Sequence, residues 1–295
     1  MNIVVLGPGA IGSLWAYNLM QAGHNVSVWS RSSDKHYHFR LDDSPSIQLI
    51  NNDIESLHKA DLILVTVKAW QVEAALQSIA IHIAPETVLM LMHNGMGSAE
   101  RLPTTLTQHP ILLATTTHGA YKPSVDQVLH TGLGATQVGP YNELGKQCSF
   151  VAEVLQHALT DVNWNEHIEH ALWQKLAVNC AINPLTAIHQ IKNGKLADPR
   201  YHKEITGIVS EVVLIMNAKG FPAKSEPLCE MIYSVINATA ENYSSMHQDV
   251  MHHRPSEIDF ITGYLLDTAK AQNISAPFNQ ALFNEIKEIE KNWTP

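Results

Sequence analysis

Hydrophobic and polar residues alternate at the start of the chain in short blocks whose periodicity changes from strand to helix. Residues 2–6 form an apolar run, a glycine-rich turn follows, and residues 10–22 show a helical pattern. Gly23 is placed to end that helix, and a second apolar run covers residues 25–29. This order predicts a βαβ unit.

Further apolar runs continue the same alternation. Short, continuous runs occur at 61–67, 87–92 and 111–117, and such runs are typical of strands covered on both faces of a parallel sheet. The remaining elements predicted for this part are strands at 126–130, 134–139 and 162–165 and a helix at 147–159. The pattern therefore predicts an α/β domain.

The pattern changes near residue 167. Helical periodicity without intervening strands covers residues 168–182, 204–220, 228–241 and 257–273. A length of 295 residues also exceeds what one core usually organises. We expect two domains, an α/β domain at 1–166 and an all-helical domain at 167–295.

Composition narrows the partners of the protein. A formal net charge of -9 provides no general attraction to nucleic acid or anionic lipid. No uninterrupted apolar stretch approaches the ~20 residues that a membrane helix requires, and the N-terminus lacks the pattern of a signal peptide. We expect a protein that acts on a small molecule in the cytoplasm, as a monomer or homodimer, without nucleic-acid or membrane partners.

Cysteine and histidine spacing argues against a metal site. Cys148, Cys180 and Cys229 lie far apart and show no CxxC spacing, which suits a reduced compartment. The 17 histidines include neighbouring pairs but no HExxH or comparable motif. We expect no metal.

The glycine-rich turn matches the pattern GxGxxG. Its residues are Gly7, Pro8, Gly9, Ala10, Ile11 and Gly12. The pattern alone is weak, but here it follows a strand and opens a helix, the context of a dinucleotide fingerprint. Gly7 is expected to make the tight turn, Gly9 to admit the diphosphate, and Gly12 to let helix and strand pack closely. The first domain is therefore predicted to be a Rossmann-type dinucleotide-binding domain.

The end of the second predicted strand indicates which dinucleotide binds. An acidic residue there would favour NAD(H), whereas this chain has Ser30-Arg31. A guanidinium suits a 2′-phosphate, and Lys68 can supply a second positive charge. Asp34 lies nearby but follows the strand rather than ending it. We predict NADP(H).

A polar stripe crosses the otherwise apolar segment 171–182. Lys175, Asn179 and Asn183 follow one another in steps of four, so they lie near one face of a helix. The stripe can be the wet face of an amphipathic helix. With a nicotinamide cofactor it instead suits reduction of a carbonyl, which requires a proton donor near the oxygen. Apolar surroundings are expected to lower the pKa of Lys175.

Several strings resemble those of the ketopantoate reductase (2-dehydropantoate 2-reductase) family. They are GPGAIGSLW, VTVKAWQ, HNGMG, TTTHGA, LWQKLAVNCAINPLTA, NGKL, ATAENYSSM and SEIDFITGYL, in this order from Met1 to Leu282. The resemblance implies NADPH-dependent reduction of 2-dehydropantoate to pantoate in pantothenate biosynthesis. It also implies that Lys175 is the general acid and that Glu257 binds the substrate's terminal hydroxyl and helps to align Lys175.

The resemblance assigns the remaining site residues as well. The implied substrate-binding residues are Asn94, Asn179, Asn183, Asn193, Asn242 and Ser245. The implied cofactor-binding residues are those of the glycine turn together with Arg31, Lys68, Gln71 and Asn94.

Plainer explanations exist for some of these residues. Glu257 follows Pro255-Ser256, where a carboxylate can cap a helix. Ser244 and Ser245 are adjacent, so the helix phase decides which hydroxyl is available. Asn193-Gly194 is also an ordinary turn dipeptide, and Cys180 suits a core position.

Two alternative functions stay open. The first is an NADP-dependent reductase or dehydrogenase of another short oxo or hydroxy acid on the same scaffold. The second is a non-catalytic protein that senses NADPH, although such a protein has no use for a lysine among apolar residues.

Overall fold

The computed structural model describes residues 1–293, and the chain divides into two compact units. The first comprises Met1–His93 and Ser98–Ile168. The second begins at Glu169 and includes the short segment Asn94–Gly97. The hydrophobic pattern predicts a boundary after residue 166, but it does not reveal that Asn94–Gly97 packs with the helices.

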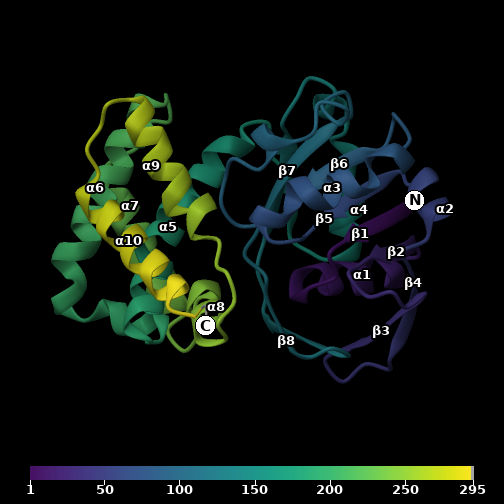
Figure 1. The fold of residues 1–295 in the computed structure, drawn as a ribbon, viewed down its shortest axis with the longest axis horizontal. Coiled ribbons are helices and arrows are strands. Elements are labelled where there is room, and N and C mark those ends of the chain that lie inside the picture. Colours follow the sequence, from purple (N-terminus) through teal and green to yellow (C-terminus); the bar gives the residue numbers. More distant parts are fainter. Residues whose placement is uncertain (294–295) are drawn as a thin grey trace. The chain divides into compact units, whose positions relative to one another are not determined.

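The first unit is built on a mainly parallel sheet. Among the described residues, eleven strands follow the order β11-β10-β7-β6-β5-β1-β2-β4-β3-β9-β8. Figure 1 labels β1 to β8. They are β1 (Asn2–Leu6), β2 (Asn25–Trp29), β3 (His36–Leu41), β4 (Ile47–Asn51), β5 (Leu62–Val65), β6 (Val88–Leu91), β7 (Ile111–Thr116), β8 (Gly119–Ser124), β9 (Gln127–Gly132), β10 (Thr136–Pro140) and β11 (Val162–Trp164). The strands from β7 to β4 in this order pair in parallel.

Helices cover both faces of this sheet. They are α1 (Ala10–Gln21), α2 (Ile54–His58), α3 (Val72–Ile79) and α4 (Phe150–Ala158). Successive residues of a strand face opposite sides. Ile3 and Val5 accordingly join the core that contains α1 and α4, whereas Val4 and Leu6 join the core that contains α2 and α3. Burial on both faces explains why β1 is a continuous apolar run.

The strand order reverses at β1. From β1 the chain passes to β2 on one side, and it later returns to β5 on the other side. The carboxyl ends of these parallel strands lie at the same edge of the sheet, and ligands of open α/β sheets bind at such a reversal. The glycine turn follows β1 at this edge.

The sequence analysis does not predict three of the strands, β3, β4 and β8. In β3, exposed His36, His38 and Arg40 alternate with buried Tyr37, Phe39 and Leu41. A strand with one wet face contains no continuous apolar run, so it differs from the runs that predict the central strands. Each strand that the sequence analysis predicts corresponds to a strand in the structure.

The second unit is helical within the described residues. Its helices are α5 (Ile168–His189), α6 (His202–Ala218), α7 (Ser225–Ala238), α8 (Ser245–Met251), α9 (Thr262–Ala271) and α10 (Pro277–Lys291). Their apolar faces share one core. The periodicity predicts α5, α6, α7 and α9, but it misses α8 and α10. The buried stripe of α10 consists of Asn279, Leu282 and Ile286, so its apolar signal is narrow.

Residues 1–293 contain neither a membrane-spanning helix nor a cluster of metal ligands. No helix there combines the length and apolar character needed to cross a membrane. Nor do three or more His, Cys, Asp or Glu side chains gather there in a way that could hold a metal ion.

We predict that Gly12→Ala destabilises the fold whereas Gly9→Ala does not. A Cβ on Gly12 would lie 2.3 Å from Thr66 Oγ1 and 2.6 Å from the carbonyl oxygen of Gly7, so helix and strand must move apart. Overpacking of this kind costs about 1–3 kcal/mol. A Cβ on Gly9 would approach nothing nearer than 4.0 Å. Urea unfolding of both variants measures the difference, and equal stabilities would contradict the packing role of Gly12.

Candidate active site

The glycine turn has the geometry of a diphosphate cradle. Gly7 has φ +88°, and a Cβ there would lie 2.3 Å from Val67 Cγ1. Gly12 packs closely, as described above, but the position of Gly9 is open. Only the middle glycine therefore leaves free space before α1, which fits the approach of a dinucleotide to the backbone.

The N-terminus of α1 is suited to an anion. Its N-cap residue is Gly9, no side chain caps the helix, and the first turn contains no acidic residue. The first N–H groups and the positive end of the helix dipole therefore face the open space. These features fit the diphosphate of NADP(H).

Side chains from three elements fix the carbonyl group of Pro8. Its oxygen accepts hydrogen bonds from Tyr37 Oη at 2.7 Å and from Ser13 Oγ at 3.1 Å. Lys122 Nζ lies 3.4 Å from the same oxygen and also donates to the hydroxyl of Tyr37. Sequence reasoning missed these residues because they lie on α1, β3 and β8 and share no local motif.

Arg31, Lys68 and Gln71 lie at the carboxyl ends of two strands. Arg31 follows β2 and is exposed. Lys68 and Gln71 follow β5, where Gln71 Oε1 accepts a hydrogen bond from the Lys68 backbone N–H at 3.2 Å. Both strands pair with β1, so all three residues follow strands that adjoin the glycine turn.

Asp34 does not end the second strand. Its carboxylate accepts a hydrogen bond from Ser32 Oγ at 2.6 Å, within the loop that follows β2. The acidic side chain is thus used inside the loop, and it does not occupy the position that favours NAD(H).

In the second unit, the segment Asn94–Gly97 packs against the residues that precede α9. The Met96 N–H donates to the carbonyl oxygen of Phe260 at 2.8 Å. A Cβ on Gly95 would lie 2.4 Å from that same oxygen, and one on Gly97 would lie 2.8 Å from the Tyr264 ring. Both glycines have positive φ. Close backbone contact therefore explains the glycines of HNGMG.

Asn94 reaches the carboxylate of Glu257. The distance from Asn94 Nδ2 to Glu257 Oε2 is 3.3 Å. Glu257 is only 4% exposed, and it precedes a short 3-10 helix (Ile258–Phe260) that its side chain does not cap. The alternative explanation of Glu257 as a helix cap is therefore wrong.

Lys175 lies on α5 in the electrostatic field of Glu257. Burial lowers the pKa of Lys175 from 10.5 to about 8, and the opposing effect of the Glu257 charge is smaller. Part of the side chain remains accessible, but its ammonium loses enough hydration to destabilise the charged form. The expected direction of the pKa is confirmed. A lysine of this pKa can exchange protons near neutral pH.

The two asparagines of the stripe become more buried along α5. Asn179 is partly buried and Asn183 is 6% exposed. With Lys175 they occupy positions four residues apart on one helix. The stripe is therefore not an ordinary solvent-exposed face, because Lys175 and Asn179 are partly buried and Asn183 is buried.

The helix phase decides between the adjacent serines. Ser244 is buried and caps α8, since its Oγ accepts a hydrogen bond from the His247 N–H at 3.0 Å. Its Oγ also lies 2.7 Å from Thr186 Oγ1. Ser245 is exposed, so its hydroxyl is the one available to a ligand.

Asn193 and Asn242 lie together through the backbone. The Asn193 N–H donates to the carbonyl oxygen of Asn242 at 2.9 Å. Asn193 Nδ2 donates to Thr239 Oγ1 at 2.9 Å, whereas its buried Oδ1 has no hydrogen-bond partner in the described chain. Asn242 is exposed. Asn193 therefore retains one acceptor for a further partner.

Three other residues near the site motifs are either buried in the core or hydrogen-bonded to neighbouring side chains. Cys180 is fully buried, and burial raises its pKa to about 12, which suits a core residue rather than a nucleophile. His93 Nε2 lies 2.5 Å from Ser98 Oγ. His118 Nδ1 lies 3.1 Å from His130 Nε2.

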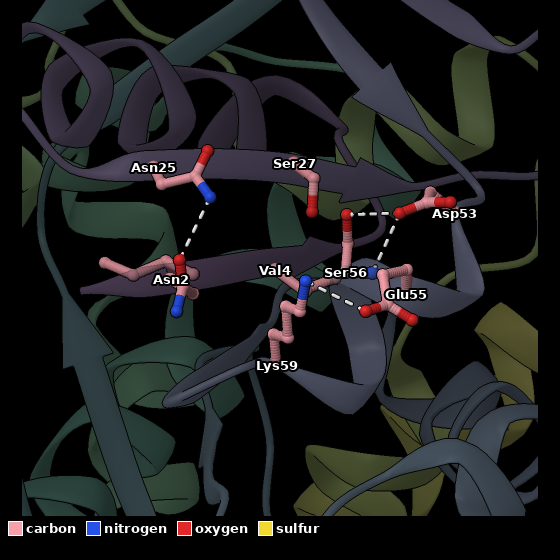
Figure 2. A pocket seen from close by; sticks show the side chains of 9 residues that line it. Asn2, Val4, Asn25, Ser27, Asp53, Glu55, Ser56 and Lys59 are labelled. Carbon is pink, nitrogen blue, oxygen red and sulfur yellow. Dashed lines mark hydrogen bonds and ion pairs between the residues drawn. The ribbon is translucent and has the colours of Figure 1, made fainter.

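A separate small pocket lies in the first unit, and no residue of the glycine turn lines it (Figure 2). It has a volume of about 160 Å³ and includes Asn2, Asn25, Asp53, Glu55 and Lys59. Its polar groups largely bind one another: Asn25 donates to Asn2, and Lys59 pairs with Glu55 at 2.9 Å. The pocket contains none of the candidate site residues.

Known structures share this fold. D-mandelate dehydrogenase with NADH and anilino(oxo)acetate matches with a TM-score of 0.90 and 22% identity over 100% of both chains. A PanE/ApbA family ketopantoate reductase from Ralstonia eutropha matches with a TM-score of 0.88 and 24% identity, also over 100% of both chains.

Sequence comparisons are more specific. The chain is 54% identical to 2-dehydropantoate 2-reductase of Vibrio cholerae over 294 residues, which cover 100% of this chain and 99% of the relative. It is 41% identical to the Escherichia coli O157:H7 protein of that name over 298 residues, covering 99% and 96% of the two chains. Residues 3–143 match "Ketopantoate reductase PanE/ApbA", and residues 167–290 match "Ketopantoate reductase PanE/ApbA C terminal". The chain thus belongs to the ketopantoate reductase family.

Proposed function

We propose that this protein is an NADP(H)-dependent oxidoreductase that reduces 2-dehydropantoate to pantoate in pantothenate biosynthesis. The observation that carries the proposal is the partly buried Lys175, with its pKa lowered to about 8 beside Glu257, in a member of the ketopantoate reductase family. The identity of 54% to a 2-dehydropantoate 2-reductase supports the substrate.

The first unit, up to about residue 166, is proposed to hold the cofactor. The open position at Gly9 and the uncapped N-terminus of α1 suit the diphosphate. Arg31 and Lys68 are proposed to bind the 2′-phosphate, with Gln71 supporting the Lys68 backbone. Bound NADPH supplies the hydride that the C2 carbonyl carbon of the substrate receives.

The helical unit is proposed to supply the acid and the substrate contacts. Lys175 stabilises and protonates the carbonyl oxygen as negative charge develops there. Glu257 holds the ammonium charged and binds the terminal hydroxyl of the substrate, while Asn94 orients the Glu257 carboxylate.

Neutral polar groups are proposed to bind the rest of the substrate. Asn179 and Asn183 extend from Lys175 along α5, and Ser245 offers an exposed hydroxyl for the carboxylate. Asn193 and Asn242, joined through their backbones, complete the proposed set. Neutral donors can bind an anion without adding charge near Lys175.

We also propose that the protein acts on its small-molecule 2-oxo acid in the cytoplasm, as a monomer or homodimer. The three cysteines form no disulfide, which suits a reducing compartment. Turnover on 2-dehydropantoate compared with other branched 2-oxo acids tests the substrate. A preference for another acid would favour the alternative reductase, and no NADPH oxidation with any acid would favour the sensor.

We predict that Lys175→Ala lowers kcat by at least about 100-fold, the range of general acid catalysis. The Kd for NADPH should be almost unchanged because Lys175 is not among the proposed cofactor-binding residues, and the proposed diphosphate and 2′-phosphate contacts lie in the first unit. Stopped-flow absorbance measures turnover, and fluorescence titration measures the Kd. Lys291→Ala, which removes an exposed lysine that pairs with Glu288, is the control. Normal turnover of the Lys175 variant would remove the lysine from the mechanism.

We predict that the rate of reduction falls as pH rises through about 8. Since the pKa of Lys175 is lowered to about 8, the charged acid is present below that pH and is lost above it. Glu257→Gln removes the charge that raises this pKa, so the alkaline limb should move to lower pH. Single-turnover rates across the pH range test both statements.

The control for the pH experiment is Asp259→Asn. Asp259 is close to Glu257 in sequence but exposed, and it pairs with Lys287 at 2.9 Å. Its substitution should leave the alkaline limb in place. An identical limb in wild type and Glu257→Gln would show that the carboxylate does not act on Lys175.

We predict that Arg31→Glu erases the preference for NADPH over NADH, because a carboxylate repels the 2′-phosphate and can bind ribose hydroxyls. The ratio of the two kcat/KM values measures this preference. Arg40→Glu, at an exposed position on β3, is the matched charge reversal. An unchanged ratio in the Arg31 variant would show that another residue reads the phosphate.

A further inference from the structure

The loop that carries Arg31 is held by a side chain from another strand end. Asn52 immediately follows β4, which pairs with β2. Its Oδ1 accepts a hydrogen bond from the Ser30 N–H at 2.9 Å, and its Nδ2 donates to the carbonyl oxygen of Ser32 at 2.5 Å. One carboxamide therefore binds the backbone on both sides of Arg31.

The conformation of Asn52 makes this contact possible. Its φ is +56°, which is uncommon for a residue other than glycine but is tolerated by asparagine. Its own N–H donates to the carbonyl oxygen of Val28 at 3.1 Å, so its backbone is anchored to β2. The side chain thus starts from a fixed position.

A second residue supports the same loop. Asn51 is 4% exposed, and its Nδ2 donates to the carbonyl oxygen of Asp34 at 2.7 Å. Within the loop, the Ser32 hydroxyl donates to the Asp34 carboxylate at 2.6 Å. The backbone from Ser30 to Asp34 is therefore connected at several points to the end of β4.

The Arg31 side chain itself is not held. It is exposed and makes no hydrogen bond or ion pair with the rest of residues 1–293. Binding a phosphate must therefore order a long side chain, and that ordering costs free energy. A backbone that is already fixed reduces the freedom that remains to be lost.

We propose that Asn52 is a positioning residue for cofactor selectivity: by fixing the backbone around Arg31, it holds the guanidinium for a ribose 2′-phosphate. The ligand is the phosphate monoester that distinguishes NADP(H) from NAD(H). This inference rests on the proposed use of NADP(H). It adds a residue that does not itself touch the phosphate, but on which discrimination between the two cofactors depends.

The test is Asn52→Gly, because glycine keeps the positive φ and only the carboxamide is lost. Fluorescence titration should show a Kd for NADPH raised by roughly threefold to tenfold, the effect of losing one or two hydrogen bonds. The Kd for NADH should change by less than about twofold, since the diphosphate cradle is untouched. Equal changes for both cofactors, or none, would overturn the proposal.

The control is Asn273→Gly. Asn273 also has φ +56°, but it follows α9 in the helical unit. This variant makes the same substitution at a positive φ far in sequence from the Arg31 loop. It should therefore leave the ratio of the NADPH and NADH Kd values unchanged. Thermal unfolding of both variants verifies that they fold. A shift of the ratio in this control equal to that of Asn52→Gly would also overturn the proposal.

A double-mutant cycle with Arg31→Ala separates positioning from a general structural effect. If Asn52 acts through Arg31, Asn52→Gly should not alter the Kd ratio further in the Arg31→Ala background. An additive effect would show that Asn52 acts independently. If the wild type binds both cofactors equally, the proposed cofactor itself fails, and this result is distinguishable from failure of Asn52 alone.

Discussion

The proposed chemistry of this protein depends on an ammonium group that has lost part of its hydration beside a buried carboxylate. Burial favours the neutral amine of Lys175, and the charge of Glu257 favours the cation. Burial has the larger effect, which leaves the pKa at about 8. In the unfolded chain the pKa of this lysine is 10.5, whereas in the fold it is about 8. The buried ammonium therefore lowers the free energy of unfolding below pH 8, and this loss disappears as pH rises from 8 to 10.5. A group that costs stability in this way is typical of functional sites.

In both units, glycines allow close backbone contacts near the candidate site residues. In the first unit, three glycines have three different surroundings, and only Gly9 is open. In the second, Gly95 and Gly97 allow close contact with the chain around Phe260 and Tyr264. This contact brings Asn94 to Glu257. These glycines therefore shape the backbone of the candidate site and contribute no side chain to it.

Much of the fold can be predicted because burial on both faces gives β1, β5 and β6 continuous apolar runs. The same reasoning misses β3, whose exposed histidines interrupt the apolar pattern. Among the proposed site residues, Lys175 is predicted from its apolar surroundings and Arg31 from its place after a strand. The sequence analysis does not single out Asn52, Tyr37 or Lys122, because their contacts join segments that are distant in the sequence.

The shift of the Lys175 pKa is the central claim, and it can be measured without turnover. Lysine side chains enriched in ¹³C can be followed by NMR between pH 6 and 11, with Lys175→Met identifying the signal. We predict one lysine that titrates near pH 8 and disappears from the spectrum of that variant. If the Lys175 signal instead titrates near 10.5, the ordinary value for lysine, the account of this site is wrong.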